Sequence, residues 1–404
     1  MNKLLTHLTL IYCCLGLSTQ TQAQAQDFNA RAPNASKQQA AFAGQTRAPL
    51  LPEHYQLHVE TITTGLEHPW GMVQLPNGSW LLTERPGRMR LVSPDGQLSE
   101  PIGGVPAVDA RGQGGLLDVV INTDFEDTRR VWWSYAEARG NGTNATAVAT
   151  GILSENYRQL SDVQVIFQQN PPWLSNAHFG SRLVFDTDGM LFITTGDRYQ
   201  ASSLAQDVNT HIGKVLRINP QGGTATGNPT IKGGQAEIWS YGHRNIQSAA
   251  LAADGSLWTV EHGARGGDEL NQPQAGLNYG WPIITYGVDY SGRAIGEGLT
   301  AHESMEQPVY YWDPVIAPSG MAFYQGDLFA DWQNDILIGG LASQSLIRLR
   351  LKDGQVIGEA RYLQHDQGRI RDVDVAQDGA IMLLIDDANG KLLRVTPTLL
   401  SKKP

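Results

Sequence analysis

Short apolar runs, each followed by a polar turn that carries glycine and then by a second apolar run, recur along the chain after Pro52. Asn-Gly and Asp-Gly turns accept the positive φ of a tight hairpin, so each copy predicts two antiparallel strands. Four copies are clear, with turns at Gly78, Gly189, Gly255 and Gly379, and two looser copies run from Val120 to Tyr135 and from Phe323 to Gly339.

Six copies spaced about every 60 residues predict an all-β, six-bladed β-propeller with four-stranded antiparallel blades. The runs at His58–Ile62 and Lys391–Val395 would close the ring by sharing one blade. A pair of β-sandwiches is the alternative that the uneven spacing leaves open. In a propeller, ligands bind on loops from several blades, so functional residues should come from distant parts of the chain.

The first residues have the pattern of an export signal. Lys3 precedes an apolar stretch from Leu4 to Leu17, and Ala23-Gln-Ala25 is a small-x-small cleavage pattern. The stretch is shorter than the ~20 residues that span a bilayer, so we expect a signal peptide over 1–25, a periplasmic or secreted protein and no membrane span. Lipidation at Cys13 or Cys14 is the weaker alternative. The Ala- and Gln-rich residues 26–51 predict a flexible linker, and 52–400 the propeller.

Composition narrows the classes of function. With 44 Gly among 404 residues and only 17% charged residues, the chain is unlike a helical bundle or coiled coil. Its net charge of -10 and the absence of a Lys/Arg run give no footprint for nucleic acid. Both cysteines lie in the leader, so the mature protein would rely on a large core or on bound metal instead of disulfides.

Five loops carry more polar residues than turns require. Gln113 lies in a glycine-rich segment that is equally consistent with a tight turn. His178 precedes a strand, where a lone histidine is more often structural than catalytic. Tyr241-Gly-His-Arg-Asn245 has the composition of an anion or carbonyl clamp, and the carboxylates, amides and glycines of 261–282 suit Ca²⁺ without matching an EF-hand.

The fifth loop contains Arg369 and Arg371, which share one face of a strand. Two guanidinium groups repel each other unless an anion lies between them. The residues alone leave two possibilities, which are a carboxylate-rich ligand or salt bridges to Asp366, Asp372 and Asp374.

Together these segments resemble the glucose/sorbosone dehydrogenase family of soluble aldose dehydrogenases, which use pyrroloquinoline quinone (PQQ). The resemblance covers about 65–395 and rests on GQGGLL, HFGSRLVF, SYGHRN, EHGARGGDELN, NYGWP and GRIRD in that order. It implies a periplasmic oxidoreductase that oxidises the C1 hydroxyl of aldoses to lactones by hydride transfer to PQQ. The rival classes are a calcium-dependent lactonase-type propeller hydrolase and a propeller binding module without catalysis.

The resemblance also implies roles for individual residues. His178 would be the general base, with Gln113 and Arg244 beside it in the catalytic site. The cofactor would be bound by Gln113, Arg244, Asn245, Tyr290, Arg369 and Arg371. One Ca²⁺ would bind the cofactor and the carbonyls of Gly263 and Ala264, and a second would bind Glu269 and the Tyr279 carbonyl.

The chain departs from the family pattern at two positions, because Ala264 replaces the usual Pro and no Lys lies in the stretch 338–343. We expect an aldose as substrate, a quinone or small redox protein as electron acceptor, and a monomer or homodimer. Neither the sugar nor the acceptor follows from these motifs. Trp312 could stack on a sugar ring or pack beneath a loop.

Overall fold

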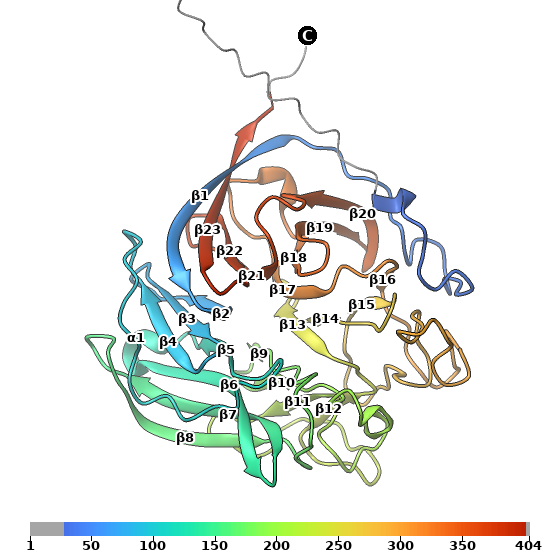
Figure 1. Cartoon of the computed structure of the whole chain (residues 1–404), viewed down its shortest axis with the longest axis horizontal. Coiled ribbons are helices and arrows are strands. Elements are labelled where there is room, and N and C mark those ends of the chain that lie inside the picture. Colours follow the sequence, from blue (N-terminus) through green and yellow to red (C-terminus); the bar gives the residue numbers. More distant parts are fainter. Residues whose placement is uncertain (1–27, 401–404) are drawn as a thin grey trace, which may run out of the picture.

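The computed structural model describes residues 28–400, which form six antiparallel sheets around a central axis (Figure 1). The predicted six-bladed β-propeller is therefore confirmed. Five blades have four strands, and the blade of β2–β4 has three, with an antiparallel bridge from Val92 to Leu98 beside its outer strand.

The six blades follow one another along the chain. The first holds β2 (Pro69–Gln74), β3 (Trp80–Glu84) and β4 (Arg88–Val92). The second holds β5 (Leu116–Ile121), β6 (Arg130–Gly140), β7 (Thr143–Leu153) and β8 (Leu160–Gln168). The third holds β9 (Leu183–Phe185), β10 (Leu191–Thr194), β11 (Lys214–Ile218) and β12 (Ile238–Tyr241).

The fourth blade holds β13 (Ile246–Leu251), β14 (Leu257–Glu261), β15 (Asp268–Asn271) and β16 (Tyr310–Trp312). The fifth holds β17 (Pro318–Phe323), β18 (Ile336–Gly340), β19 (Ser345–Lys352) and β20 (Gln355–Tyr362). The sixth holds β21 (Ile370–Val375), β22 (Ile381–Ile385), β23 (Gly390–Leu399) and β1 (Tyr55–Leu66). Helical turns are short, namely η1 (Phe28–Ala30), α1 (Phe125–Thr128), η2 (Ser202–Ala205) and η3 (Ala330–Trp332).

The repeated sequence unit is the inner hairpin of each blade. In the four clear copies the glycine of the turn has a positive φ, between 76° and 85°, as the Asn-Gly and Asp-Gly signals predict. The two looser copies form β5–β6 and β17–β18. The ring closes as expected, because β1 pairs with β23 over nearly its whole length and so brings the first and the last strand of the chain into the sixth blade (Figure 1).

The hydrophobic core lies between neighbouring sheets. One cluster packs Leu81 of the first blade against Trp133 of the second, and another packs Leu337 of the fifth blade against Leu383 of the sixth. Equivalent clusters fill the other blade junctions. Burial of these faces holds the ring together without any disulfide in residues 28–400.

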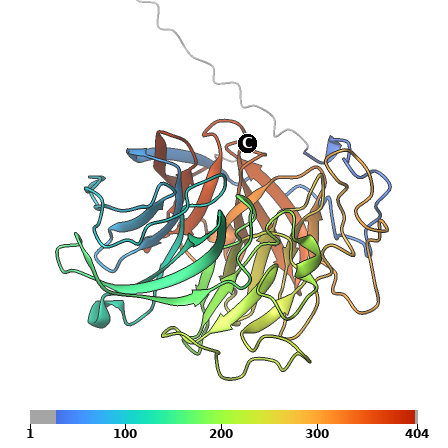
Figure 2. The same cartoon turned by 60° about the horizontal axis from the view of Figure 1, so that its bottom comes forward.

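The segment from Phe28 to Leu51 differs from the flexible linker that its composition predicts. Gln45 and Ala48 are fully buried, and the backbone N–H groups of Asn34 and Ala35 donate to the Asp313 carboxylate at 2.7 and 2.8 Å. Figures 1 and 2 both show this blue segment beside the orange loops that precede β16. The predicted signal peptide lies outside the described residues. No helix within 28–400 has the length and apolarity needed to cross a bilayer.

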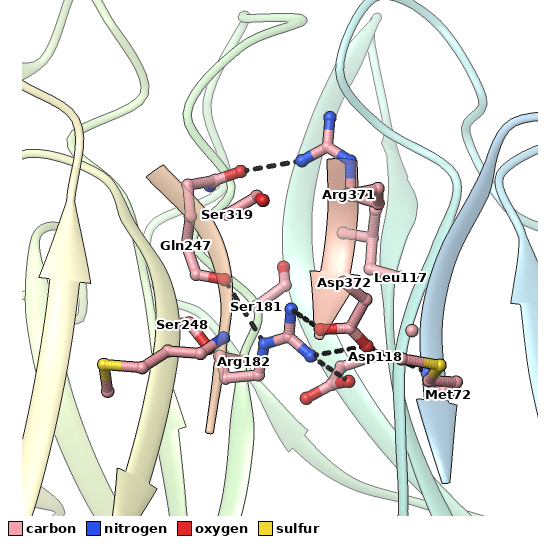
Figure 3. Close-up of polar contacts among 12 residues, drawn as sticks. Met72, Leu117, Asp118, Ser181, Arg182, Gln247, Ser248, Ser319, Arg371 and Asp372 are labelled. Carbon is pink, nitrogen blue, oxygen red and sulfur yellow. Dashed lines mark hydrogen bonds and ion pairs between the residues drawn. The ribbon is translucent and has the colours of Figure 1, made fainter. Parts of the chain in front are cut away.

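The central channel is closed by a ring of residues, one from each inner strand or from the residue just before it: Gly71, Asp118, Arg182, Ser248, Gly320 and Asp372. Arg182 donates to Asp118 at 2.9 Å and forms an ion pair with Asp372 at 3.1 Å (Figure 3). The two glycines leave room for these carboxylates, because a Cβ on Gly320 would lie 2.0 Å from Asp372 Oδ1. This ion cluster forms the floor beneath the candidate site.

Candidate active site

The predicted functional residues lie at one rim of the propeller. Gln113, His178 and Arg244 each lie a few residues before an inner strand, namely β5, β9 and β13, and Arg369 directly precedes β21. Inner strands of a propeller run in the same sense around the axis, so residues at the start of each strand converge on one end of the channel. The shared position in the repeat is what brings distant segments of the chain together.

A cavity of about 150 Å³ lies among these segments. It is lined by four of the predicted cofactor residues, Gln113, Asn245, Arg369 and Arg371. The prediction omitted most of the other lining residues, which are Trp70, Arg85, Leu117, Phe179, Gly180, Gln247, His262, Leu341 and Asp386. Three guanidinium groups against one carboxylate make this cavity electropositive.

The counter-ion of the paired arginines is Asp386. Its Oδ2 lies 3.4 Å from Arg369 Nε and 3.3 Å from Arg371 Nη2. Burial alone would raise the pKa of Asp386, but Arg371, the contact with His68 and Arg369 lower it to about 2. Asp366, Asp372 and Asp374 form no ion pair with the two arginines, so that alternative is wrong.

The three guanidinium groups of the cavity, those of Arg85, Arg369 and Arg371, carry more positive charge than the single Asp386 carboxylate balances. Burial lowers the pKa of Arg371 to about 10, and the charges of Arg369 and Arg85 act in the same direction. Its Nε is buried and has no hydrogen-bond partner among residues 28–400. A buried donor of this kind is costly unless a ligand supplies the acceptor, so the site suits an anionic ligand.

His178 is held in place by two hydrogen bonds. Its Nδ1 lies 2.6 Å from Asp197 Oδ1, and its backbone N–H donates to the Gln113 side-chain oxygen at 2.8 Å. Burial lowers the pKa of His178, an effect that Asp197 opposes and the charge of Arg244 reinforces. The imidazole is therefore neutral near pH 7, with Nδ1–H bonded to Asp197 and Nε2 as the basic nitrogen.

Arg244 contacts residues of the loops that follow β14 and β15. Its Nη1 donates to the carbonyls of His262, at 3.0 Å, and Gly263, and its Nη2 lies 3.4 Å from the Tyr290 hydroxyl. Its guanidinium carbon lies 5.2 Å from the centroid of the Trp281 ring. The same indole donates to Asp197 Oδ2 at 2.8 Å, so Trp281 joins the Arg244 side of the site to the base.

The predicted calcium ligands fall into two places. The Gly263 carbonyl accepts from Arg244, next to the buried Ala264. Glu269 shares Asn271 Nδ2 with Glu261, and burial together with the Glu261 charge raises the pKa of Glu269 well above its usual value. Asn271 Oδ1 is buried without a partner among the described residues. An orphaned amide oxygen beside two carboxylates is a donor set that suits a hard cation.

Tyr279 is connected to the Glu261 carboxylate through His243. Its ring stacks on His243 with the centroids 4.9 Å apart, and His243 Nδ1 lies 3.0 Å from Glu261 Oε1. Trp312, in contrast, is 2% exposed and packs in the core against Tyr310. Of the two roles considered for Trp312, the structure therefore shows packing beneath a loop.

The cavity is joined to the channel floor through Gln247. Its side-chain oxygen accepts from Arg371 Nη1 at 3.2 Å, and its backbone carbonyl accepts from Arg182 Nε at 3.2 Å (Figure 3). The Gln247 amide nitrogen also lies 3.3 Å from Asn245 Oδ1. Arg371 and Asn245 are thus fixed to one another by a side chain that is itself anchored to the ion cluster.

Asp197 and Asp386 were not among the predicted residues, although the sequence carries a signal for both. The second run of four repeats ends on or just before an acidic residue, as Glu84, Asp197, Glu261 and Asp386 show. Each of these carboxylates is buried at the functional rim or binds a residue there. Aligning the repeats on their ends, rather than on their turns, would have found them.

A family comparison decides how this site is classified. The glucose/sorbosone dehydrogenase family model matches residues 66–394, which is most of the chain. The chain belongs to the glucose/sorbosone dehydrogenase family. It is therefore a sugar oxidoreductase on the same propeller scaffold as other members of that family.

Individual relatives support this assignment. Aldose sugar dehydrogenase YliI of Escherichia coli is 44% identical over 84% of this chain and 93% of its own length. Quinoprotein glucose dehydrogenase B of Acinetobacter calcoaceticus is 25% identical over 84% of this chain and 88% of its own length. The PQQ-bound aldose sugar dehydrogenase of Streptomyces coelicolor superposes with a TM-score of 0.72 at 28% identity, covering 85% of this chain and 99% of that structure.

Proposed function

We propose that this glucose/sorbosone dehydrogenase family member oxidises the C1 hydroxyl of an aldose to the lactone with PQQ as cofactor and His178 as general base. The observation that carries the proposal is the neutral His178–Asp197 pair next to an electropositive cavity, which is lined by the neighbouring Phe179 and by Gln113, the hydrogen-bond partner of His178. A base and an anion receptor at one site fit a reaction in which a proton leaves the C1 hydroxyl oxygen and a hydride leaves C1 itself.

The residues of the cavity fit PQQ, which carries three carboxylates and two adjacent quinone carbonyls. Arg369 and Arg371 would receive carboxylates, where Arg371 Nε now lacks an acceptor. Arg244 and Asn245 would donate to the quinone carbonyls, and Tyr290 would lie against the ring. When bound, PQQ supplies the hydride acceptor. The relatives named as a quinoprotein and as PQQ-bound support this choice of cofactor.

His178 would take the proton of the sugar C1 hydroxyl on Nε2. Asp197 holds Nδ1–H and stabilises the positive charge that forms on the imidazole. Gln113 fixes the backbone of the base through its side-chain oxygen. Arg244 brings a positive charge close to the reacting groups and would stabilise negative charge that develops on a carbonyl oxygen there.

Calcium is proposed at the two positions that the motifs indicate. The carbonyls of Gly263 and Ala264 would bind one ion beside Arg244, which at present donates to the Gly263 carbonyl. Glu269, the orphaned Asn271 oxygen and the Tyr279 carbonyl would hold the other. Calcium would act there as a Lewis acid at the first position and as a structural ion at the second.

The aldose would enter from an open hollow of about 520 Å³ beside the base. Gln113 lines both this hollow and the cofactor cavity. Tyr199, which is 52% exposed, packs edge-on against the His178 ring at 5.3 Å and offers a face for a sugar ring. The leader pattern at 1–25 supports a periplasmic or secreted location for this reaction.

Reconstitution tests the proposal directly. The apo-protein should oxidise aldoses with an artificial dye as electron acceptor only when both PQQ and Ca²⁺ are added. His178→Ala should keep PQQ binding and lose most turnover. In a binding module, the same substitution would leave function unchanged, because such a module does not need His178. A lack of activity over a broad aldose panel, after PQQ binding has been shown by equilibrium dialysis, would contradict the proposal and favour the hydrolase or the binding module.

A further inference from the structure

Asp197 and Arg198 are adjacent residues that hold opposite ends of His178. Asp197 binds the imidazole at Nδ1, and Arg198 Nη1 donates to the His178 backbone carbonyl at 3.3 Å. Both follow β10, in a loop where Arg198 and Tyr199 have positive φ angles of 56° and 65°. The family resemblance assigned no role to Arg198.

Arg198 is an unusual cation because it is fully buried without an ion pair. It is 0% exposed, and no carboxylate among residues 28–400 lies within ion-pair distance of its guanidinium. Its Nη2 donates to the Ser175 carbonyl at 2.9 Å and to the Asn144 side-chain oxygen. Its guanidinium carbon lies 3.6 Å from the centroid of the Phe179 ring. Burying a charge without an ion pair is costly, so a compensating role for this guanidinium is expected.

The segment that Arg198 grips is conformationally strained. His178 has a φ of 52° and Ser181 a φ of 89°, in the left-handed region that is unfavourable for residues other than glycine. The Gly180 backbone N–H is held by Asn245. Arg198 contacts residues before and within that strained turn, since it donates to Ser175 and His178 and lies on Phe179. A planar guanidinium can make these contacts together, whereas an ammonium cannot.

We infer that Arg198 is a positioning residue for His178. The guanidinium of Arg198 holds the left-handed turn that carries the imidazole and places a fixed positive charge beside that ring. The inference rests on the proposed role of His178 as the base. The role of Arg198 depends on the loop that carries His178, and it does not depend on the cofactor or on the calcium ions.

The positive charge of Arg198 is expected to change the pH at which His178 titrates. The charged or titratable groups that influence His178 are Asp197, Arg244, Arg198 and His262. Burial lowers the pKa of His178, Asp197 opposes this, and Arg244 and Arg198 add to it. Burial also lowers the pKa of Arg198, to about 9, so Arg198 is still protonated at neutral pH. Removing its charge should raise the pKa of His178 and so favour the protonated, inactive imidazole.

Arg129 provides a matched control. It also has a positive φ, of 52°, donates to two backbone carbonyls at 2.8 and 2.7 Å, and lies over aromatic rings. It belongs to the second blade and contacts Leu153 and Ser154 instead of the His178 turn. Arg129→Met therefore reports the cost of losing a partly buried guanidinium clamp without touching the site.

The experiment compares Arg198→Met, Arg198→Lys and Arg129→Met. The imidazole of His178 is titrated by NMR in the cofactor-free proteins, with its signal identified from its loss in His178→Gln. Steady-state kinetics of the reconstituted enzymes follow. Arg198→Met should titrate at higher pH than the wild type, and its kcat should fall about tenfold to a hundredfold with a smaller change in KM. Arg198→Lys should keep the wild-type titration and recover only part of kcat, and Arg129→Met should match the wild type in both.

Two results would overturn the inference. One is an Arg198→Met protein that titrates like the wild type and loses no more activity than Arg129→Met. The other is wild-type kcat in Arg198→Lys, which remains informative if the Met variant does not fold. The titration needs neither PQQ nor sugar, so a protein without sugar oxidation would contradict the proposed function while the NMR result still decided the role of Arg198.

Discussion

Asp197 Oδ1 lies 2.6 Å from His178 Nδ1, and the same oxygen accepts the backbone N–H of Tyr199 at 2.8 Å. Trp281 donates to the other carboxylate oxygen. With three donors in place, the carboxylate cannot rotate away from the imidazole, and the tautomer with a free Nε2 is fixed. Two residues of one blade therefore form the proposed base, and an indole from a distant loop fixes its carboxylate.

Asp197→Asn tests this arrangement. An amide can present its N–H₂ group to the imidazole, which would then place the ring proton on Nε2 and remove the base. We expect kcat to fall by about 10²-fold or more, while PQQ binding is retained. Asp254→Asn, in an exposed hairpin turn, should keep full activity. Wild-type kcat in Asp197→Asn would show that the carboxylate does not orient the base.

The acid limb of the pH profile should report His178. The imidazole works only when neutral, so turnover falls as the pH drops through the folded pKa. Burial lowers that pKa, so the limb should lie below the ordinary value of about 6.5. A pH profile of kcat/KM at saturating PQQ measures it. A limb well above the ordinary histidine value would contradict the environment described for His178.

The paired arginines should act mainly on cofactor affinity. Arg369 is largely exposed and donates weakly to Asp386, so Arg369→Ala removes one carboxylate contact without opening the core. We expect PQQ to bind roughly tenfold more weakly, with kcat at saturating PQQ nearly unchanged. Isothermal titration of PQQ into the calcium-loaded apo-protein measures this. Arg394→Ala, whose partner Asp378 lies in a surface turn, is the control.

The channel floor should be intolerant of a single added methyl group. A Cβ on Gly320 would lie 2.0 Å from Asp372 Oδ1 and 2.5 Å from its Cα, so the ion cluster must move. We expect Gly320→Ala to lower the free energy of unfolding by about 3 kcal/mol in urea titrations. Gly223→Ala places its methyl group in open space at a φ of 84° and should cost only about 1 kcal/mol. Equal losses would show that the channel is not packed as described.

Much of the fold was predictable because the blades repeat a local signal. Hairpin turns such as those at Gly78 and Gly255 need only neighbouring residues, and the runs at 58–62 and 391–395 showed how the ring closes. The Phe28–Leu51 segment was not predicted as ordered, because it has no periodic apolar pattern. Its order comes from single contacts with remote residues, such as Asp313 and Tyr310.

The site was predictable to the extent that motifs carry it. Gln113, Asn245, Arg369 and Arg371 meet in one cavity as the motifs indicated. The counter-ion Asp386 was missed because salt-bridge partners were sought near Arg369 in the sequence, whereas the blade brings in the end of the next strand. Arg198 was missed for a related reason, since its partners Asn144 and Ser175 come from other loops and no local pattern marks a buried, unpaired guanidinium.

The absorption spectrum of the reconstituted protein tests the central claim most directly. The apo-protein is loaded with PQQ and Ca²⁺, its spectrum is recorded, and an aldose is then added without any electron acceptor. The account predicts a bound quinone spectrum that converts to that of the reduced cofactor within one turnover in the wild type, and that stays oxidised in His178→Ala. A wild-type protein that binds PQQ but leaves it oxidised with every aldose tested would contradict it.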